Sequence, residues 1–245
     1  MIHSEEYIAG SKRNNVFDLL DKTIRVDDHF LRMRLHGEFA DISNDIFFVT
    51  HDKKQGLSRI WMGYGKHNNS ICNWGAVFTP EEHRGNGYCA KTLNFCFEYI
   101  DKMKDAPLAL FCTAGSLELT NLYKKYGFTT AICGADRGPL YRPLGDSPKN
   151  FQEFYKQYYT KTDELLVADA TFEWRNEIDC LLRFALIDAG ETFGINGIND
   201  LWPIVLNEPQ RAKVVLTKEN KCVGWMVDGE AQVYPLYRNM KITNI

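Results

Sequence analysis

The sequence lacks any apolar run long enough to cross a membrane, because no stretch approaches the roughly 18 consecutive apolar residues that a spanning helix needs. The opening stretch MIHSEEYIAGSKRNN also lacks the apolar core of a signal peptide. Neither charge sign dominates, since the formal net charge of the 245 residues is -3 at pH 7. These absences predict a soluble, cytoplasmic protein with no nucleic-acid or membrane partner.

The cysteines lack the pattern of a disulfide framework or a zinc site. There are seven, an odd number, and no two of them form a C-x-x-C pair. Most stand inside apolar runs such as LALFCTA and LNFCFEYI. We therefore expect reduced thiols and no metal site.

What the sequence does have is enough apolar material for a large core. Hydrophobic residues make up 44% of the chain and charged residues 25%, which fits one large domain or two modest ones. Residues 15–36 carry apolar residues at helical spacing and predict one or two helices. The runs IFFVT, SRIWMGYG and ICNWGAVF follow, separated by turn residues, and predict three antiparallel strands.

The spacing of apolar residues then changes from strand to helix. Residues Leu93, Cys96, Phe97 and Ile100 form the stripe of a helix packed on a sheet. LALFCT predicts a buried strand, SLELTNLYKKYGF a helix capped by Ser116, and FTTAICGAD with PLYRPLG a closing strand pair. The predicted fold class is a mixed α/β domain over residues 1–145.

The remaining chain predicts a smaller α/β region. GDSPKN at 145–150 is the expected linker, and residues 150–245 begin with an aromatic-rich helix, FQEFYKQYY. A strand, a helix and a hairpin should follow. VGWMVDG in this hairpin resembles RIWMGYG in the first half, so the region is either a degenerate second copy or a C-terminal extension.

The stretch TPEEHRGNGYCAKTL, residues 79–93, places two glycines directly before a predicted helix, an arrangement typical of phosphate-binding turns. GNGYCA fits the dinucleotide pattern G-x-G-x-x-A, yet PEEHR separates the preceding strand from Gly85, and LALFCT ends without an acidic residue. A Walker P-loop would need a Lys-Ser/Thr pair after Gly87, and there is none.

With Arg84 included, the turn reads R-G-N-G-Y-C, and LTNLYKKYGF stands some thirty residues on. Here the sequence resembles the GCN5-related N-acetyltransferases (GNAT), whose motif runs Gln/Arg-x-x-Gly-x-Gly/Ala. Arg84 and Gly87 match, whereas Cys89 replaces the usual Gly or Ala, and Ser116 stands where an Asn often opens the next motif. The resemblance covers about residues 1–145 and is strongest over 74–128. It implies a GNAT-like acyl-CoA N-acyltransferase fold.

The resemblance also implies acetyl-CoA as cofactor and acetyl transfer to a primary amine by direct attack. Main-chain N–H groups around the two glycines would hold the coenzyme A diphosphate, and the preceding strand its pantetheine arm, with one strand N–H as oxyanion donor. The cradle residues are Arg84, Gly85, Asn86, Gly87, Tyr88, Cys89 and Ala90, and the strand residues are Val77, Phe78 and Thr79.

Tyr123 matches the family's tyrosine beside the thioester sulfur. A tyrosine hydroxyl is ordinarily a weaker acid than a thiol, so a hydrogen bond to the sulfur is the expected role, and a core position is the alternative. Ser116 and Asn121 are further cofactor candidates, with a helix cap and a surface amide as alternatives.

No general base can be assigned, because all six histidines precede residue 84 without a carboxylate at diagnostic spacing. Glu38, Glu81, Glu82 and Asp136 stay open, as does His83, and Cys112 is read as an inert buried thiol. The acceptor is an amino acid, a polyamine, an aminoglycoside or a protein lysine, with residues 150–245 shaping that choice. The alternatives are a non-catalytic acyl-CoA sensor or interaction module, and a dinucleotide-binding protein.

Overall fold

The computed structural model describes residues 1–191 and 198–244, with side chains for residues 1–191 and 201–243. It divides into two compact units, an N-terminal unit (Met1–Pro107) and a C-terminal unit (Leu108–Ile245). Within the described ranges, no helix combines the length and the apolar character that crossing a bilayer requires.

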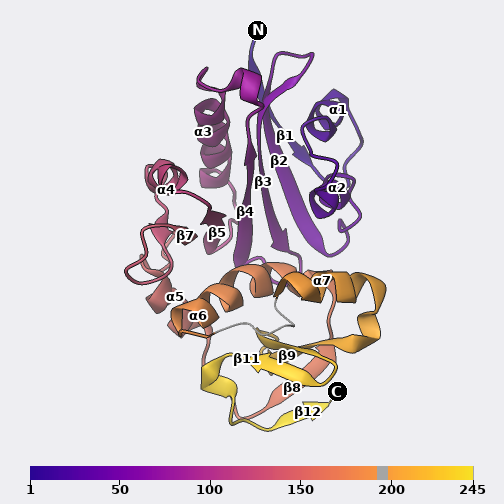
Figure 1. The fold of residues 1–245 in the computed structure, drawn as a ribbon, viewed down its shortest axis with the longest axis vertical. Coiled ribbons are helices and arrows are strands. Elements are labelled where there is room, and N and C mark those ends of the chain that lie inside the picture. The colour runs from indigo at the N-terminus through magenta and orange to yellow at the C-terminus, as the bar shows by residue number, and fades with distance from the viewer. Residues whose placement is uncertain (192–197, 245) are drawn as a thin grey trace. The chain divides into compact units, whose positions relative to one another are not determined.

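The N-terminal unit is a four-stranded antiparallel sheet with helices on both faces (Figure 1). Its strand order is β1-β2-β3-β4. Its elements are β1 (His3–Ile8), α1 (Asn15–Asp21), α2 (His29–Leu35), β2 (Ser43–His51), β3 (Gly56–Gly65), β4 (Ile71–Phe78), the 3-10 helix η1 (Glu81–His83) and α3 (Tyr88–Asp101). The predicted helices and the three central strands are confirmed, and β1 is an additional strand.

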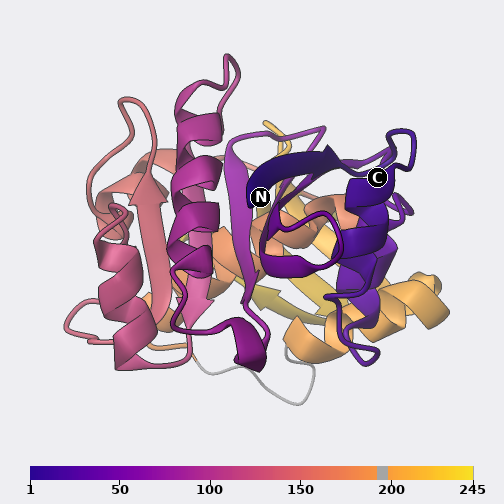
Figure 2. The ribbon, with the colours of Figure 1, turned by 90° about the horizontal axis from the view of Figure 1, so that it is seen from above.

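The alternation of side chains along β2 places different helices on the two faces of the sheet. Phe47 and Val49 belong to one core with Phe17 and Leu20 of α1. Phe48, on the opposite face, packs against the α3 residue Tyr99 with ring centroids 5.3 Å apart. Figures 1 and 2 accordingly show α1 and α2 on one side of these strands and α3 on the other.

The C-terminal unit contains two groups of strands. β5 and β6 both pair antiparallel with β7, and a five-stranded sheet has the order β11-β10-β9-β8-β12. Since β12 runs parallel to β8 and the other pairs are antiparallel, this sheet is mixed, and the predicted mixed α/β class is confirmed. The elements are β5 (Ala109–Ala114), α4 (Leu117–Lys124), β6 (Thr129–Thr130), β7 (Gly138–Pro143), α5 (Phe151–Tyr158), β8 (Leu165–Asp169), η2 (Phe172–Trp174), the π-helix η3 (Glu177–Leu182), α6 (Arg183–Asp188), α7 (Ile198–Asn207), η4 (Pro209–Arg211), β9 (Ala212–Thr217), β10 (Cys222–Val227), β11 (Glu230–Val233), η5 (Pro235–Tyr237) and β12 (Ile242–Asn244).

The two units share a strand order. In the C-terminal unit, β8 is followed by α6 and α7 and then by β9, β10 and β11, each strand antiparallel to the one before it. In the N-terminal unit, β1 is followed in the same way by two helices and three strands. Trp61 and Trp225, the tryptophans of the two similar sequence stretches, are both buried in the third strand of their series. This agrees with a degenerate second copy, which stays a prediction together with the boundary at 145–150.

Candidate functional site

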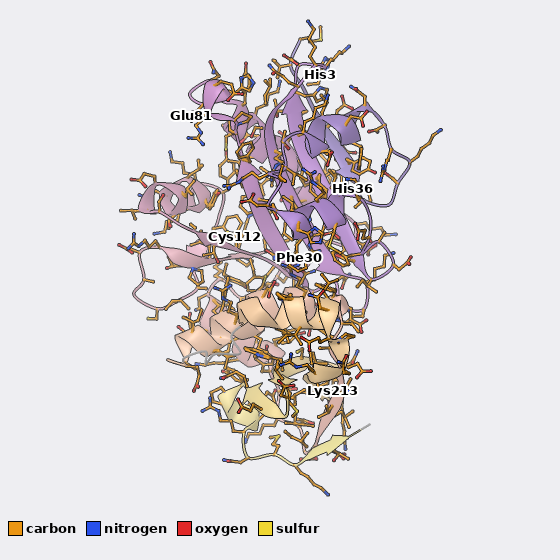
Figure 3. All side chains as sticks on the ribbon, turned by 45° about the vertical axis from the view of Figure 1, so that its right-hand side comes forward. His3, Phe30, His36, Glu81, Cys112 and Lys213 are labelled. Carbon is orange, nitrogen blue, oxygen red and sulfur yellow. The ribbon has the colours of Figure 1, made fainter. Side chains whose placement is uncertain are left out.

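The glycine turn lies in the N-terminal unit between β4 and α3. The 3-10 helix η1, whose Glu81 is exposed (Figure 3), separates the end of β4 from the two glycines. Gly85 has φ +77° and Gly87 has φ +76°, the left-handed region where other residues lose about 1–2 kcal/mol. A Cβ built at either position would have no described atom within 4 Å. Backbone conformation therefore requires these glycines, and the space beside them is open to a ligand.

Helix α3 begins at this turn without a cap. Gly87 is its N-cap residue, no described side chain caps it, and its first turn contains no acidic residue. The first intrahelical hydrogen bond runs from the Lys91 N–H to the Gly87 carbonyl at 3.0 Å, so the three preceding N–H groups have no partner within the helix. Helices α1, α2, α4 and α5 differ, because side chains of Asn14, Asp28, Ser116 and Asn150 cap them. The N-terminus of α3 thus suits an anion.

Two side chains of the turn bind its own carbonyl groups. Asn86 Nδ2 donates to the carbonyl oxygens of His83 and Arg84, each at 3.2 Å. Arg84 Nε donates to the carbonyl oxygen of Thr79 at 3.3 Å. Carbonyl oxygens repel an anion, and these three are engaged inside the turn. The donors left for a diphosphate are main-chain N–H groups, so the residues present fit the coenzyme A diphosphate.

The first turn of α3 is tied to the sheet by hydroxyl and thiol groups. Thr92 Oγ1 lies 2.8 Å from Thr50 Oγ1 of β2. Thr79 Oγ1 donates to Ser58 of β3 at 3.1 Å and also forms a hydrogen bond with Cys89. Burial raises the pKa of the Cys89 thiol, and the hydrogen bond to Thr79 acts in the opposite direction. The thiol that replaces the usual small residue is therefore protonated at neutral pH.

Strand β4, predicted to hold the pantetheine arm, contains a bulge. Trp61 pairs with Gly75 and Arg59 pairs with Phe78, so Ala76 and Val77 together face a single residue of β3. Ala76 adopts φ +48°, a left-handed conformation that alanine rarely takes. The candidate strand residues Val77, Phe78 and Thr79 are partly buried.

The candidates Ser116, Asn121 and Tyr123 belong to the C-terminal unit. Ser116 Oγ accepts a hydrogen bond from the Leu119 N–H at 3.3 Å, which confirms the predicted cap of α4. Asn121 is exposed on the same helix. Tyr123 is 5% exposed, with its ring centroid 6.0 Å from that of Phe128. The cofactor and sulfur-binding roles of these residues stay predictions.

Three of the acid–base candidates share a cavity of about 450 Å³ in the N-terminal unit. Glu81, Glu82 and His83 line it on one side. Its other lining residues are Lys22, Thr23, Ile24, Arg25, Gln55, Gly56, Phe78 and Pro80. The cavity therefore adjoins the end of β4 and presents both charge signs to a bound molecule. Glu38 and Asp136 are exposed elsewhere, and no base is assigned.

Cys112 of β5 is 6% exposed, and burial raises the pKa of its thiol. Since the thiolate is the nucleophilic form, this environment agrees with an inert thiol.

Sequence reasoning missed Arg59, which holds the β4 bulge. Its guanidinium group donates to the carbonyl oxygen of Ala76 and lies 5.2 Å from the centroid of the Phe78 ring. The sequence did contain one indication of its position. Arg59 stands two residues before the core residue Trp61 in a predicted strand, so both side chains point to the same face of the sheet.

Comparison with known proteins finds similarity at the level of solved structures. No protein-family model matches the chain, and no curated protein matches it. An acyl-CoA N-acyltransferase from Pseudomonas aeruginosa is 14% identical with a TM-score of 0.42, and the match covers 58% of this chain and 99% of that chain.

Two further structures show similarity of the same extent. An acetyltransferase of the GNAT family from Staphylococcus aureus is 14% identical with a TM-score of 0.41, over 59% of this chain and 100% of that chain. The N-acetyltransferase PseH from Campylobacter jejuni is 14% identical with a TM-score of 0.40, over 58% of this chain and 99% of that chain.

Proposed function

We propose that this protein is an acetyl-CoA-dependent N-acetyltransferase that transfers an acetyl group to a primary amine by direct attack. The observation that carries the proposal is the turn with two left-handed glycines leading into the uncapped, 14-residue helix α3. Such a turn offers several converging N–H donors and the positive end of a helix dipole, as a diphosphate requires.

The residues that would hold the coenzyme are main-chain groups for the most part. The N–H groups of residues 85–90 would bind the diphosphate, because the Arg84 N–H already donates to the Glu81 carbonyl at 3.1 Å. The Arg84 side chain adds a positive charge beside them. Val77, Phe78 and Thr79 would lie along the pantetheine arm. When bound, acetyl-CoA supplies a thioester carbonyl carbon that an amine can attack.

The protein's own contribution to the chemistry is hydrogen bonding and exclusion of water. A main-chain N–H of β4 would donate to the thioester oxygen as negative charge develops there. The Tyr123 hydroxyl would donate to the sulfur atom and stabilise the departing thiolate. The amine must be neutral to attack, and its proton would leave through water, because no side chain is assigned as base.

The acceptor classes proposed are those of the sequence: an amino acid, a polyamine, an aminoglycoside or a protein lysine. The 450 Å³ cavity beside η1 is large enough for a small amine and carries two exposed carboxylates, Glu81 and Glu82. Residues 150–245 would shape the acceptor choice, and the protein would act in the cytoplasm.

The cofactor part of the proposal is tested by calorimetry with acetyl-CoA and with NAD. We expect binding of acetyl-CoA and none of NAD; the opposite result would assign a dinucleotide-binding function. Gly87→Ala should weaken acetyl-CoA binding at least 10-fold. Gly190→Ala is the matched control, because Gly190 has φ +77° and open space and lies outside the turn. Both substitutions should cost similar stability, about 1–2 kcal/mol.

The enzymatic part is tested by thiol release from acetyl-CoA with a panel of amines from the four classes. Turnover with one class would establish the transferase and its acceptor. Tight acetyl-CoA binding without turnover on any amine would instead support a non-catalytic sensor.

A further inference from the structure

The bulge residue Ala76 has a strained, left-handed backbone conformation inside a strand, where such a conformation requires a physical cause. Among the described residues, the other non-glycine residues with positive φ are Lys53, Asn220 and Asp228, and all three lie in turns between strands. Ala76 lies inside β4 and lacks a polar side chain that could stabilise the conformation locally. Backbone strain of this kind persists only when surrounding groups hold it, and it concentrates at functional sites.

Arg59 is the side chain that holds the bulge. It is 4% exposed and donates through Nη1 to the Ala76 carbonyl oxygen. Its Nε donates to the carbonyl oxygen of Thr23 at 3.4 Å, just after α1, and its guanidinium group stacks over Phe78. One buried side chain therefore contacts the bulge at Ala76, the next paired strand residue Phe78, and Thr23 at the end of α1.

Arg59 forms no direct ion pair with a carboxylate among the residues that the structure describes; its hydrogen bonds go to two main-chain carbonyls, and the Asp28 carboxylate acts on its charge only through a Coulombic interaction. Arg34 is equally buried at 4% exposure, yet it forms an ion pair with Asp45 at 2.8 Å. Burial lowers the pKa of Arg59 to about 10, so the group stays charged at neutral pH. Burying a cation without a direct ion pair is costly, and the hydrogen bonds to the Thr23 and Ala76 carbonyls offset part of that cost.

The direction of the Ala76 carbonyl fixes the direction of the next N–H group. No peptide bond in the described chain is cis, so the C=O of Ala76 and the N–H of Val77 point in opposite directions. Since the carbonyl points to Arg59, the Val77 N–H points away from it. A cation on the carbonyl oxygen also polarises the peptide group and strengthens its N–H as a donor.

We infer that Arg59 is a positioning residue that, through the Ala76 carbonyl, orients and polarises the Val77 N–H toward the thioester oxygen. This inference rests on the proposed acetyl transfer. In that reaction the amine nitrogen forms a C–N bond to the acetyl carbon, the C–S bond breaks, and the amine proton ends on the coenzyme A thiol. The Val77 N–H keeps its proton and only donates a hydrogen bond.

The test compares Arg59→Lys with Arg34→Lys, an equally buried arginine that pairs with Asp45 and lies over the Trp61 ring but forms no hydrogen bond to the bulge carbonyl. For Arg59→Lys we expect kcat to fall roughly 10- to 100-fold, with KM for acetyl-CoA within about threefold of wild type, because the effect belongs to the transition state. With ¹⁵N-valine labelling, the Val77 amide resonance should shift. Arg34→Lys should lower stability while kcat stays near wild type and the Val77 resonance shifts less than in Arg59→Lys.

Wild-type kcat and an unshifted Val77 resonance in Arg59→Lys would overturn the inference. If Arg59→Lys folds poorly, the substitution is made in an Ala76→Gly background, because glycine removes the backbone strain at residue 76. The double variant is then compared with Ala76→Gly alone. A roughly 10- to 100-fold lower kcat in the double variant supports the inference, and equal kcat values in the two proteins contradict it. A wild-type protein that does not bind acetyl-CoA refutes the proposed function, and the Val77 resonance still decides whether Arg59 orients that amide.

Discussion

Thr92 of α3 and Thr50 of β2 lie with their hydroxyl oxygens 2.8 Å apart, and both side chains are fully buried. Thr50 Oγ1 also lies 3.0 Å from Ser4 Oγ of β1, and Thr92 Oγ1 lies 2.9 Å from the Tyr88 carbonyl. A chain of hydroxyl groups therefore connects the first turn of α3 with two strands. This chain fixes the position of the N–H groups that we propose bind a diphosphate.

Thr92→Val keeps the shape of the side chain and removes this hydroxyl. We expect a loss of about 1 kcal/mol in the free energy of unfolding, because Thr50 loses a buried partner. The melting temperature should fall by about 2–4 °C, and acetyl-CoA affinity should fall as well. Thr113→Val is the control at an exposed strand position, where the change should stay within about 0.5 kcal/mol. Equal losses in the two variants would contradict the assigned role of the chain.

Local sequence patterns predicted most of the N-terminal unit, because β2 to β4 and α3 carry apolar residues at clear strand and helix spacings. The strand β1 escaped prediction for the converse reason. Its sequence HSEEYI has exposed Glu5 and Glu6, and Tyr7 is its one fully buried side chain. Pairing with β2, rather than an apolar run, makes it a strand. Helix α7 was missed in a stretch that contains Pro203, a residue that normally argues against a helix.

The candidate site, like the fold, could be predicted from the sequence only in part. The glycines of the turn could be predicted because left-handed conformations leave a mark in the sequence. The function of Arg59 could not, because it depends on contacts with Thr23 and Ala76, which are 36 and 17 residues away along the chain. Sequence spacing alone also left Asn86 as one cradle residue among seven, whereas its side chain binds carbonyls inside the turn.

Asn86→Ala removes the donor that engages the His83 and Arg84 carbonyls. We expect acetyl-CoA affinity to fall roughly 5- to 10-fold, about 1 kcal/mol, because freed carbonyls can turn toward the anion. Asn86 is exposed, so unfolding should change by less than about 0.5 kcal/mol. Asn86→Asp should weaken binding further, since it adds a negative charge beside the diphosphate. Calorimetry on the three proteins checks this order, and an unaltered affinity in Asn86→Ala would count against the role assigned to its amide.

Cys89 should react slowly with iodoacetamide at neutral pH. Burial raises its pKa above the ordinary value of 9.0, so the reactive thiolate is a minor species at pH 7.5 and grows as pH rises through 9. The exposed Cys133 provides an internal reference for the reaction. Mass spectrometry should find Cys133 modified first, with acetyl-CoA protecting Cys89 and leaving Cys133 unaffected. Faster modification of Cys89 at pH 7.5, or no protection, would contradict this view of the turn.

Tyr123→Phe separates the two roles that the sequence left open for this residue. The ring stays in place beside Phe128, so packing and acetyl-CoA affinity should remain within about twofold of wild type. If the hydroxyl donates to the departing sulfur, kcat should fall roughly 10- to 100-fold. Tyr126→Phe is the control, because Tyr126 is a partly buried tyrosine close to the end of α4 and is not a candidate site residue. Thiol release and thermal unfolding measured on the same samples distinguish the outcomes: a kcat that falls only with the folded fraction places Tyr123 in the core, and a kcat that falls in fully folded protein places its hydroxyl at the reaction.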